Sequence, residues 1–159
     1  MSSPHAQKAQ EAQLLSTAQA QMHLGLSAAQ QTQLLDYLDL LEKWNRVYNL
    51  SALRTRAQML SHHVLDCLAI IGPLRHWAQA QGLEQVRALD VGSGAGLPGL
   101  VIAICQPHWS VSCVDTVGKK AAFIQQAIAH LHLPQAQAHH ARVEDLPGPY
   151  DLITSRAFA

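Results

Sequence analysis

The stretch that decides the fold is Asp90-Val91-Gly92-Ser93-Gly94-Ala95-Gly96-Leu97-Pro98-Gly99. An apolar run over 86–91, typical of a buried strand, leads into it, and an apolar segment over 97–105 with the character of a helix follows. Glycine permits the sharp turn between the two and lets a ligand approach the main chain without meeting a Cβ atom. Since the first N–H groups of the following helix would point at that ligand, the stretch predicts a binding loop.

The spacing of the glycines distinguishes two kinds of cofactor. Dinucleotide-binding loops have the pattern G-x-G-x-x-G, and Leu97 stands where their third glycine is required. The pattern here, acid-x-G-x-G-x-G, is the one expected for the S-adenosylmethionine loop of class I methyltransferases, and it predicts cofactor contacts at Gly92, Gly94 and Gly96. A nicotinamide-dependent oxidoreductase and a flexible turn without a ligand are the alternatives.

Downstream of the loop, strands and helices alternate. A strand over 110–115 precedes a helix over 119–132, and two further strands are expected at 136–141 and 150–155. Short turns between alternating strands and helices predict a parallel α/β sheet with helices on its faces. The expected fold is therefore a class I S-adenosylmethionine-dependent methyltransferase sheet of Rossmann-like type.

Polar residues at two strand ends are further candidates for cofactor contacts. Asp115 ends the second strand, nineteen residues beyond Gly96, where a carboxylate can accept hydrogen bonds from both ribose hydroxyls. Val143 and Glu144 follow the third strand, where an adenine edge would lie, and Glu144 could accept from its exocyclic amine. A solvated strand end and an ordinary charged loop are the respective alternatives.

The N-terminal half predicts a helical cap. Residues 1–23 are rich in Gln and Ala and are expected to form a flexible tail or a frayed helix. Over 24–82, Ser27 and Gln30 form a capping box that opens a helix over 28–45. A second helix begins near residue 56 and is expected to end or kink at Gly72-Pro73. Residues 83–159 are then expected to hold the methyltransferase sheet, and the family resemblance described below implies that they are only the N-terminal half of that domain.

The charge of the 159 residues is balanced, with 11 Lys and Arg against 11 Asp and Glu, so it gives no global reason to expect a nucleic-acid partner. Locally, however, no acid occurs between Glu42 and Asp66. Cations and aromatic residues alternate in this window, which suits phosphate contact and base stacking. We therefore predict that this window forms part of an RNA-docking surface. Trp44 and Tyr48 also fit the inward face of a helix, which is the alternative for them. The residues of the window are Lys43, Trp44, Arg46, Tyr48, Arg54, Arg56, His62 and His63.

Several classes of protein are disfavoured by composition. Hydrophobic residues make up 48% of the chain, which is enough for a core and argues against global disorder. Three cysteines form no C-x-x-C pair, which suggests a reducing, cytoplasmic location. The longest apolar run, over 64–71, is too short to span a membrane, and residues 1–23 have no secretory signal pattern. The histidines lack zinc-ligand spacing, so no metal is expected.

Further motifs accompany the glycine loop: Tyr48-Asn49-Leu50-Ser51, His63-Val64-Leu65-Asp66-Cys67, Lys119-Lys120, Arg142-Val143-Glu144 and Ser155-Arg156-Ala157-Phe158-Ala159. With them, residues 26–159 resemble the glucose-inhibited division protein B family, bacterial methyltransferases that modify the N7 of a guanine in 16S ribosomal RNA. The resemblance implies S-adenosyl-L-methionine as cofactor and 16S ribosomal RNA or the small ribosomal subunit as partner. It places cofactor contacts at Gly92, Leu97, Val143, Glu144 and Arg156.

The chemistry implied by this resemblance needs no general base, because guanine N7 already carries a lone pair that can attack the sulfonium methyl in line. Catalysis would rest on proximity and alignment. Arg156 could hold the methionine carboxylate or an RNA phosphate, and an exposed arginine without a ligand is the alternative. The tentative RNA contacts are Arg54, Arg56, His63 and Arg156.

The chain departs from this family in three respects. Cys67 stands where a serine is common, the loop over 144–150 is short, and family members continue past the Ser-Arg-Ala-Phe-Ala motif. We therefore expect an incomplete sheet with its fourth strand at an edge, and an isolated chain that is unstable or self-associates. A truncated, catalytically silent remnant that binds the cofactor is the alternative to an active enzyme.

Overall fold

The computed structural model describes residues 3–156 and is built around a parallel sheet with strand order β3-β2-β1-β4. Every neighbouring pair is parallel, so the carboxyl ends of all the strands meet at one edge of the sheet. The predicted α/β class is therefore confirmed. The strands are β1 (Arg87–Val91), β2 (Ser110–Asp115), β3 (Ala136–His140) and β4 (Leu152–Ser155).

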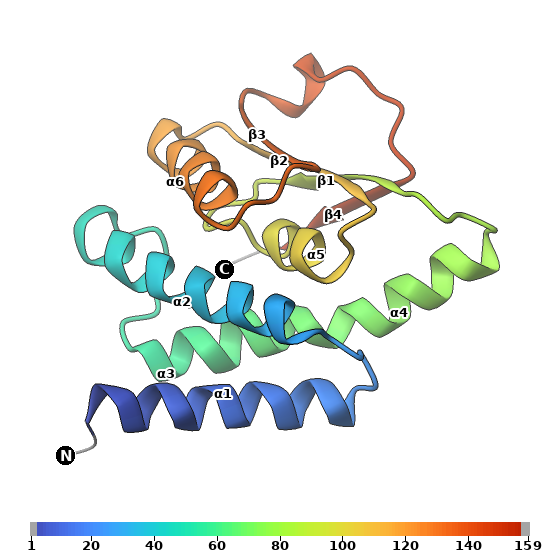
Figure 1. The fold of residues 1–159 in the computed structure, drawn as a ribbon. Helices are drawn as coiled ribbons and strands as arrows, with labels where there is room; N and C mark the ends of the chain where they lie inside the picture. Colours follow the sequence, from blue (N-terminus) through green and yellow to red (C-terminus); the bar gives the residue numbers. More distant parts are fainter. Residues whose placement is uncertain (1–2, 157–159) are drawn as a thin grey trace.

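Two helices connect these strands and pack against them. They are α5 (Gly99–Cys105), which contacts β2, and α6 (Gly118–His130), which contacts β2 and β3. Figure 1 shows both helices between the sheet and the N-terminal helices. Every residue of α5 is buried, because the sheet covers one side of this apolar helix and helices α2 and α4 cover the other.

The N-terminal helices form the cap. In chain order they are α1 (Pro4–Gln21), α2 (Ala28–Tyr48), α3 (Arg56–Met59), the π-helical segment Leu60–Leu65 and α4 (Asp66–Ala80). The predicted capping box is confirmed: Gln30 N donates to Ser27 Oγ over 3.1 Å, and Ser27 N donates to Gln30 Oε1 over 2.8 Å. Helix α2 ends at Asn49, which adopts the left-handed conformation with φ +50°.

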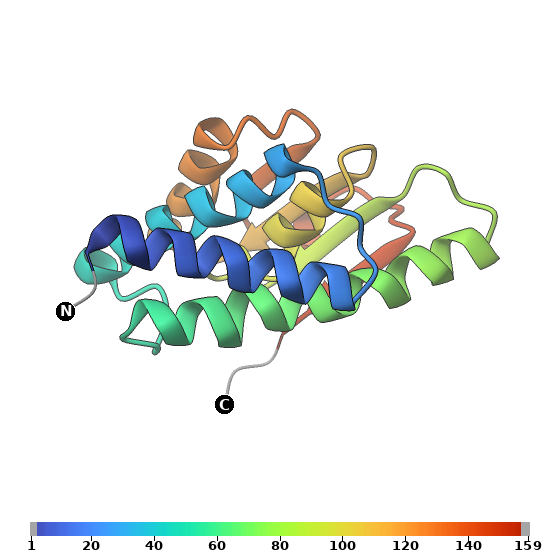
Figure 2. The same ribbon diagram turned by 60° about the horizontal axis from the view of Figure 1, so that its bottom comes forward.

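Helix α1 differs from the flexible tail that its composition favours. Figure 2 shows it lying along α2 and α4, and Leu15 on its inner side is fully buried. Glu11 accepts a hydrogen bond from Arg56 Nε over 2.7 Å, which ties α1 to α3. Both contacts join segments that are distant in the sequence, so the local composition of residues 1–23 does not reveal them.

Gly72-Pro73 does not end the second helix of the cap. Pro73 lies inside α4, which continues to Ala80, so of the two expected outcomes the helix end is wrong and the kink stays a prediction. Proline removes one backbone donor and cannot form the hydrogen bond of an interior helical residue. Burial of Leu68, Ile71 and Ala78 on one face of α4 stabilises the helix on both sides of that missing bond.

Strand β4 lies at an edge of the sheet, with β1 as its partner among the described residues. Its two apolar side chains have different environments: Leu152 packs against the core, whereas Ile153 is 63% exposed. This arrangement is the edge expected from the sequence for the fourth strand. The last three residues of the Ser-Arg-Ala-Phe-Ala motif lie outside the described part of the chain.

The packing of α1 can be tested at two adjacent leucines. We expect Leu15→Ala to lower the free energy of unfolding by about 2–5 kcal/mol, because it removes a fully buried side chain. Leu14→Ala is the control and should change stability by no more than about 0.5 kcal/mol, because Leu14 is 51% exposed. Urea denaturation of both variants measures this, and equal effects would mean that α1 is a loose tail.

Candidate cofactor site

The glycine loop turns sharply between β1 and α5. Gly92, Gly94 and Gly96 have φ values of +64°, +60° and +86°, a region that residues with a side chain rarely adopt. Gly92 and Gly94 face the solvent side of the loop, whereas Gly96 is buried beneath Leu100, whose side chain a Cβ atom would strike. Gly96 therefore serves the turn, and the first two glycines present their backbone to a ligand.

The carboxylate of Asp90 holds the loop in place. Its Oδ2 accepts hydrogen bonds from Ser93 Oγ over 2.5 Å and from Gly99 N over 3.0 Å, and its Oδ1 accepts from Thr154 Oγ1 over 2.9 Å. Asp90 is 1% exposed, and burial raises its pKa while the three hydrogen bonds act in the opposite direction. One side chain thus joins the glycine loop, the start of α5 and strand β4.

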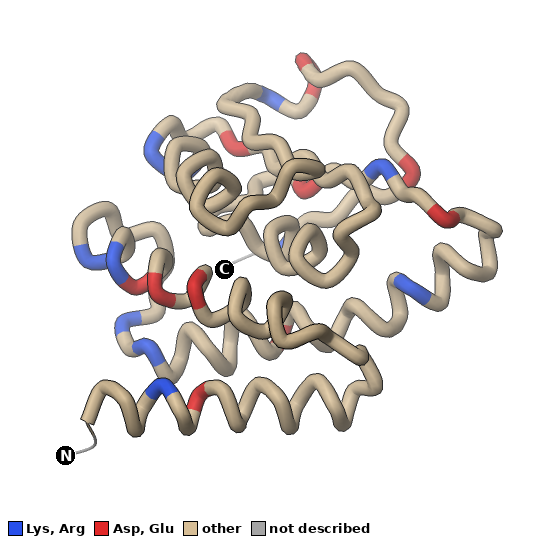
Figure 3. The backbone as a smooth tube through the Cα atoms, in the orientation of Figure 1, with Lys and Arg blue, Asp and Glu red and all other residues tan. Residues whose placement is uncertain are grey.

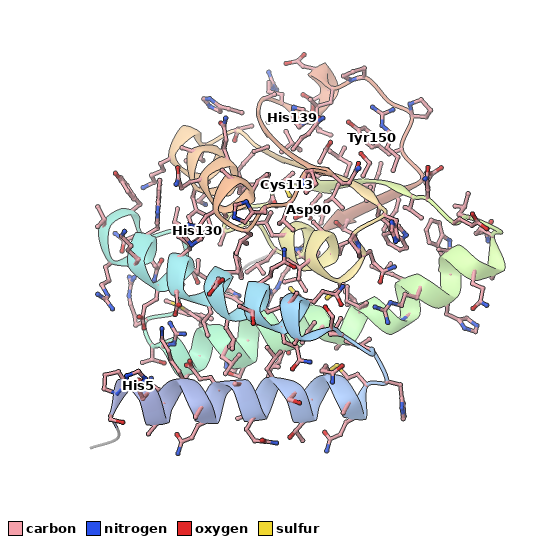
Figure 4. The ribbon with its side chains drawn as sticks, in the orientation of Figure 1. His5, Asp90, Cys113, His130, His139 and Tyr150 are labelled. Atoms are coloured by element: carbon pink, nitrogen blue, oxygen red, sulfur yellow. The ribbon has the colours of Figure 1, made fainter. Side chains whose placement is uncertain are left out.

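Gly99 is required for this arrangement. Figure 4 shows Asp90 and Cys113 side by side in the sheet, where their Cα positions are paired between β1 and β2. A Cβ atom at residue 99 would clash with Cys113 Sγ and with Asp90 Oδ2. The absence of a side chain lets the first turn of α5 lie directly on the Asp90 carboxylate.

A second carboxylate supports the loop from the neighbouring strand. Asp115 Oδ2 accepts from Gly94 N over 2.9 Å, and Asp115 Oδ1 accepts from Val117 N over 2.8 Å. Asp115 is 7% exposed. Each carboxylate oxygen can accept more than one hydrogen bond, so a ligand hydroxyl can still bind beside these amides. In the structure Asp115 positions the loop, and its predicted contact with ribose stays a prediction.

The cap is attached to the loop through a buried tyrosine. Tyr37 is fully buried in α2, and its hydroxyl donates to the carbonyl oxygen of Ala95 over 2.6 Å. Burial raises the pKa of Tyr37 well above its usual value, so the hydroxyl stays protonated. Nothing in the local sequence pattern indicates that this hydroxyl reaches the glycine loop.

A pocket of about 300 Å³ opens between the loop and the cap. The glycine loop forms one wall, and the segment that follows α2 forms the opposite wall. Lys120 from the first turn of α6 also lines the pocket. The lining residues are Asn49, Leu50, Ser51, Ala52, His63, Gly92, Ser93, Gly94, Ala95, Leu97 and Lys120.

His63 connects the pocket to strand β4. Its Nε2 lies 2.7 Å from Ser51 Oγ, and its Nδ1 lies 3.4 Å from an Nη atom of Arg156. Burial, together with the positive charge of Arg156, lowers the pKa of His63 to about 4, so the imidazole is neutral near pH 7. Arg156 also donates to the carbonyl oxygen of His62 and lies 3.8 Å from Asp66.

The structure brings only some of the predicted cofactor residues into one pocket. Gly92, Gly94 and Leu97 line it, and Asp115 lies directly behind Gly94. Val143 and Glu144 form a short 3-10 helix just after β3 and are exposed beyond the same edge of the sheet, outside the pocket lining. Glu144 pairs with Arg142 over 3.3 Å.

Arg56 does not occupy the free basic surface that the sequence window predicts. Its side chain is 11% exposed and contacts Glu11, Asp39 and Glu42, with N–O distances of 2.7, 2.7 and 3.7 Å. The window lacks acids in sequence, but α1 and α2 supply them in space. Arg54 is exposed, and it donates to Asn49 Oδ1 over 3.2 Å.

Two other kinds of site are missing from residues 3–156. No group of three or more His, Cys, Asp or Glu side chains within this part of the chain could hold a metal ion. None of its helices combines the length and the apolar character needed to cross a bilayer.

Comparison with known proteins gives a consistent result. A family model described as "GidB: rRNA small subunit methyltransferase G" matches residues 30–159. Proteins named ribosomal RNA small subunit methyltransferase G are similar over most of this chain. The protein from Acidovorax sp. (strain JS42) is 57% identical over 141 residues, which cover 86% of this chain and 62% of that protein. The protein from Leptothrix cholodnii is 56% identical over 147 residues, which cover 92% of this chain and 66% of that protein. The chain thus spans about three fifths of the length of these relatives.

The variant Asp90→Asn tests whether the three hydrogen bonds accepted by this carboxylate stabilise the fold. In Asp90→Asn, the amide NH2 would face at least one of the donors Ser93, Gly99 and Thr154, so we expect a loss of about 1.5–3 kcal/mol in unfolding free energy. Asp151→Asn is the control, because Asp151 is exposed and accepts one bond from Arg87 N. Urea denaturation at pH 7 compares the two, and equal losses would contradict a special role of Asp90.

The low pKa of His63 should make the stability of the chain depend on pH. Its pKa of about 4 in the folded chain is below the unfolded value of about 6.5, so the unfolded state binds more protons between these pH values. The stability that neutral His63 contributes is complete above about pH 6.5 and is lost as the pH falls toward 4.

The measurement is urea denaturation of wild type and His63→Gln from pH 7 to pH 4. We expect the variant to lose less stability over this interval, by about 1.4 kcal/mol per pH unit at most. His5→Gln, at an exposed position of α1 (Figure 4), is the control and should follow wild type. Parallel curves for wild type and His63→Gln would show that His63 is not held neutral.

Proposed function

Because the chain belongs to the GidB family of ribosomal RNA small subunit methyltransferases, we propose that it binds S-adenosyl-L-methionine at the glycine loop and serves methylation of the N7 of a guanine in 16S ribosomal RNA. The observation that carries this proposal is the pocket of about 300 Å³ between the glycine loop and the cap, at the carboxyl edge of a parallel sheet. Ligands of open α/β sheets bind at this edge.

The residues around the pocket fit the parts of the cofactor. The backbone of Gly92, which is exposed, and of Gly94, which is half-buried, suits the methionine end, because no Cβ atom blocks the approach. Asp115 lies at the next strand end, in reach of ribose hydroxyls, and the backbone at Val143 and Glu144 lies beyond β3 for the adenine. These assignments follow the order of the strand ends from β1 to β3.

Leu97 disfavours a dinucleotide in this site. It stands where a dinucleotide loop needs its third glycine, and it is 1% exposed within the core. In dinucleotide-binding loops the third glycine lets the following helix pack closely on the strand, and here a buried leucine side chain occupies that position. The loop therefore has Gly96 for the turn and Gly92 and Gly94 for the methionine end of the ligand, and it lacks the third glycine of a dinucleotide loop.

The proposed transfer requires alignment and a dry pocket. The lone pair of guanine N7 attacks the methyl carbon as the bond from carbon to sulfur breaks, and the positive charge moves from sulfur to the methylated base. No proton has to leave N7, so the neutral imidazole of His63 is not needed as a base. The contribution of the protein is to hold the donor and the base in line.

Cofactor binding can be tested with two glycine variants. We expect Gly94→Val to weaken S-adenosylmethionine binding at least about tenfold, or about 1.4 kcal/mol, because Gly94 lines the pocket and the side chain would enter it. Gly82→Val is the matched control, with φ +70° and open space around the Cβ position at the end of α4. It carries the same backbone strain away from the pocket.

Isothermal calorimetry with S-adenosylmethionine measures both variants, and a parallel titration with NAD distinguishes the oxidoreductase alternative. A wild-type chain that binds NAD and not S-adenosylmethionine would overturn the assignment. Equal weakening by Gly94→Val and Gly82→Val would mean that the loss arises from stability and not from the site.

Methylation itself is tested in a bacterial strain that lacks its own enzyme of this family. We expect the gene for this protein to restore N7-methylguanine in 16S ribosomal RNA, mapped by chemical cleavage at that base, and Gly94→Val to reduce the modification. Cofactor binding in vitro without any restored modification would favour the silent-remnant alternative. Modification at another ring atom would contradict N7 transfer.

A further inference from the structure

The charges of the chain are segregated along the sequence, although they cancel overall. Residues 43–65 and 116–143 contain seven of the eleven Lys and Arg residues and none of the eleven acids. The first segment contains the end of α2 and one wall of the pocket, and the second contains α6. Figure 3 shows basic residues at the end of α2 and at the start of α6 on the same side of the molecule.

Ring contacts join these two segments. Trp44 in α2 lies edge-on to Phe123 in α6, with ring centroids 5.5 Å apart, and it also stacks against Tyr48 at 5.2 Å. Phe123 is fully buried, whereas Tyr48 at the end of α2 is 41% exposed. The end of α2 therefore packs against α6, and the Tyr48 ring contacts Trp44 while remaining partly exposed to solvent.

The cations of this surface differ in how they are paired. Arg46, Arg56 and Arg142 each contact a carboxylate. Lys43, Arg54, Lys119 and Lys120 have no ion-pair partner within the part of the chain that the structure describes. The second group therefore supplies positive charge that no described acid neutralises.

Four residues of this surface line the pocket or adjoin a residue that lines it, and we call them the rim: Tyr48, Arg54, Lys119 and Lys120. Lys120 lines the pocket, and Lys119 precedes it in the first turn of α6. Tyr48 is adjacent to Asn49, a lining residue, and Arg54 holds the Asn49 side chain. The rim thus presents three cations and one partly exposed aromatic ring where a large substrate would enter.

We propose that the rim is the surface on which a single-stranded segment of RNA docks, with its phosphates on Arg54, Lys119 and Lys120 and one base stacked on Tyr48. This inference rests on the proposed function, since it deepens the account of how RNA reaches the pocket. Unpaired cations bind phosphates, and a fixed ring with an open face stacks a base of any sequence. Arg56 is bound by acids, and its expected role as an RNA contact passes in this proposal to Lys119 and Lys120, which lie 63 and 64 residues further along the chain.

The experiment is a binding titration of the full chain with deproteinised 16S ribosomal RNA at several salt concentrations. Lys119→Gln and Arg54→Gln should each lower the slope of log affinity against log salt by about 1, because each removes one phosphate contact. Tyr48→Ala should weaken binding about tenfold and keep the wild-type slope, and Tyr48→Phe should bind like wild type. Lys8→Gln is the matched control, because Lys8 lies in α1 and pairs with Asp39.

The outcomes separate this inference from the proposed function. Wild-type slopes for both Lys119→Gln and Arg54→Gln, or no salt-dependent RNA binding by wild type, would overturn the rim as a docking surface. If Lys119→Gln and Arg54→Gln weaken binding to heparin as much as binding to RNA, and Tyr48→Ala leaves RNA binding unchanged, the rim binds polyanions in general. That result would also overturn the proposal. Calorimetry with S-adenosylmethionine on the same wild-type chain tests the proposed function independently. If the chain binds the cofactor and the rim variants bind RNA like wild type, only the rim is contradicted.

Discussion

The carboxylate of Asp90 is the constraint on which the site depends. It accepts hydrogen bonds from the loop at Ser93, from the start of α5 at Gly99 and from β4 at Thr154. These donors lie up to 64 residues from Asp90 in the sequence, and their relative positions decide where the glycine loop lies on the edge of the sheet. A buried carboxylate is costly unless its oxygens are hydrogen-bonded. The same side chain therefore favours the single arrangement in which all three donors reach it.

The cap is the second requirement of the pocket, since the loop supplies only one wall. Tyr37 fixes the distance between α2 and Ala95, and the segment after α2 then lies across from Gly92 and Gly94. His63 contacts Ser51 on the pocket side and Arg156 on the β4 side. The helical cap and the sheet are thus joined around the pocket by buried polar contacts, and a change at either side alters the shape of the site.

Much of the fold follows from local patterns in the sequence. The strand–loop–helix unit, the parallel sheet and the capping box at Ser27 all depend on residues that are close in the chain, and the structure has each of them. The helix end expected at Gly72-Pro73 was not found, because burial of the α4 face outweighs the proline. Residues 4–21 form helix α1 for a related reason: Leu15 is fully buried, and Glu11 is bound by Arg56, which lies 45 residues further along the chain.

The details of the site are harder to predict from the sequence, because they too depend on contacts between residues that are distant in the chain. The motif shows that an acid precedes the glycines, but not that its carboxylate joins three segments. Arg56 has the residue type expected for an RNA contact, and only the tertiary structure shows that Glu11 and Asp39 bind its guanidinium. Tyr37 has the appearance of an ordinary core residue in the amphipathic pattern, and Lys120 reaches the pocket from a helix whose position the local pattern does not fix.

The most direct test of this account is an experimental structure of the chain bound to S-adenosylhomocysteine. The account predicts the amino-acid end of the ligand against Gly92 and Gly94, the ribose hydroxyls at the Asp115 carboxylate, and the adenine beside Val143 and Glu144. A ligand bound at the opposite end of the sheet, in the depression near Arg87 and Asp151, would contradict it.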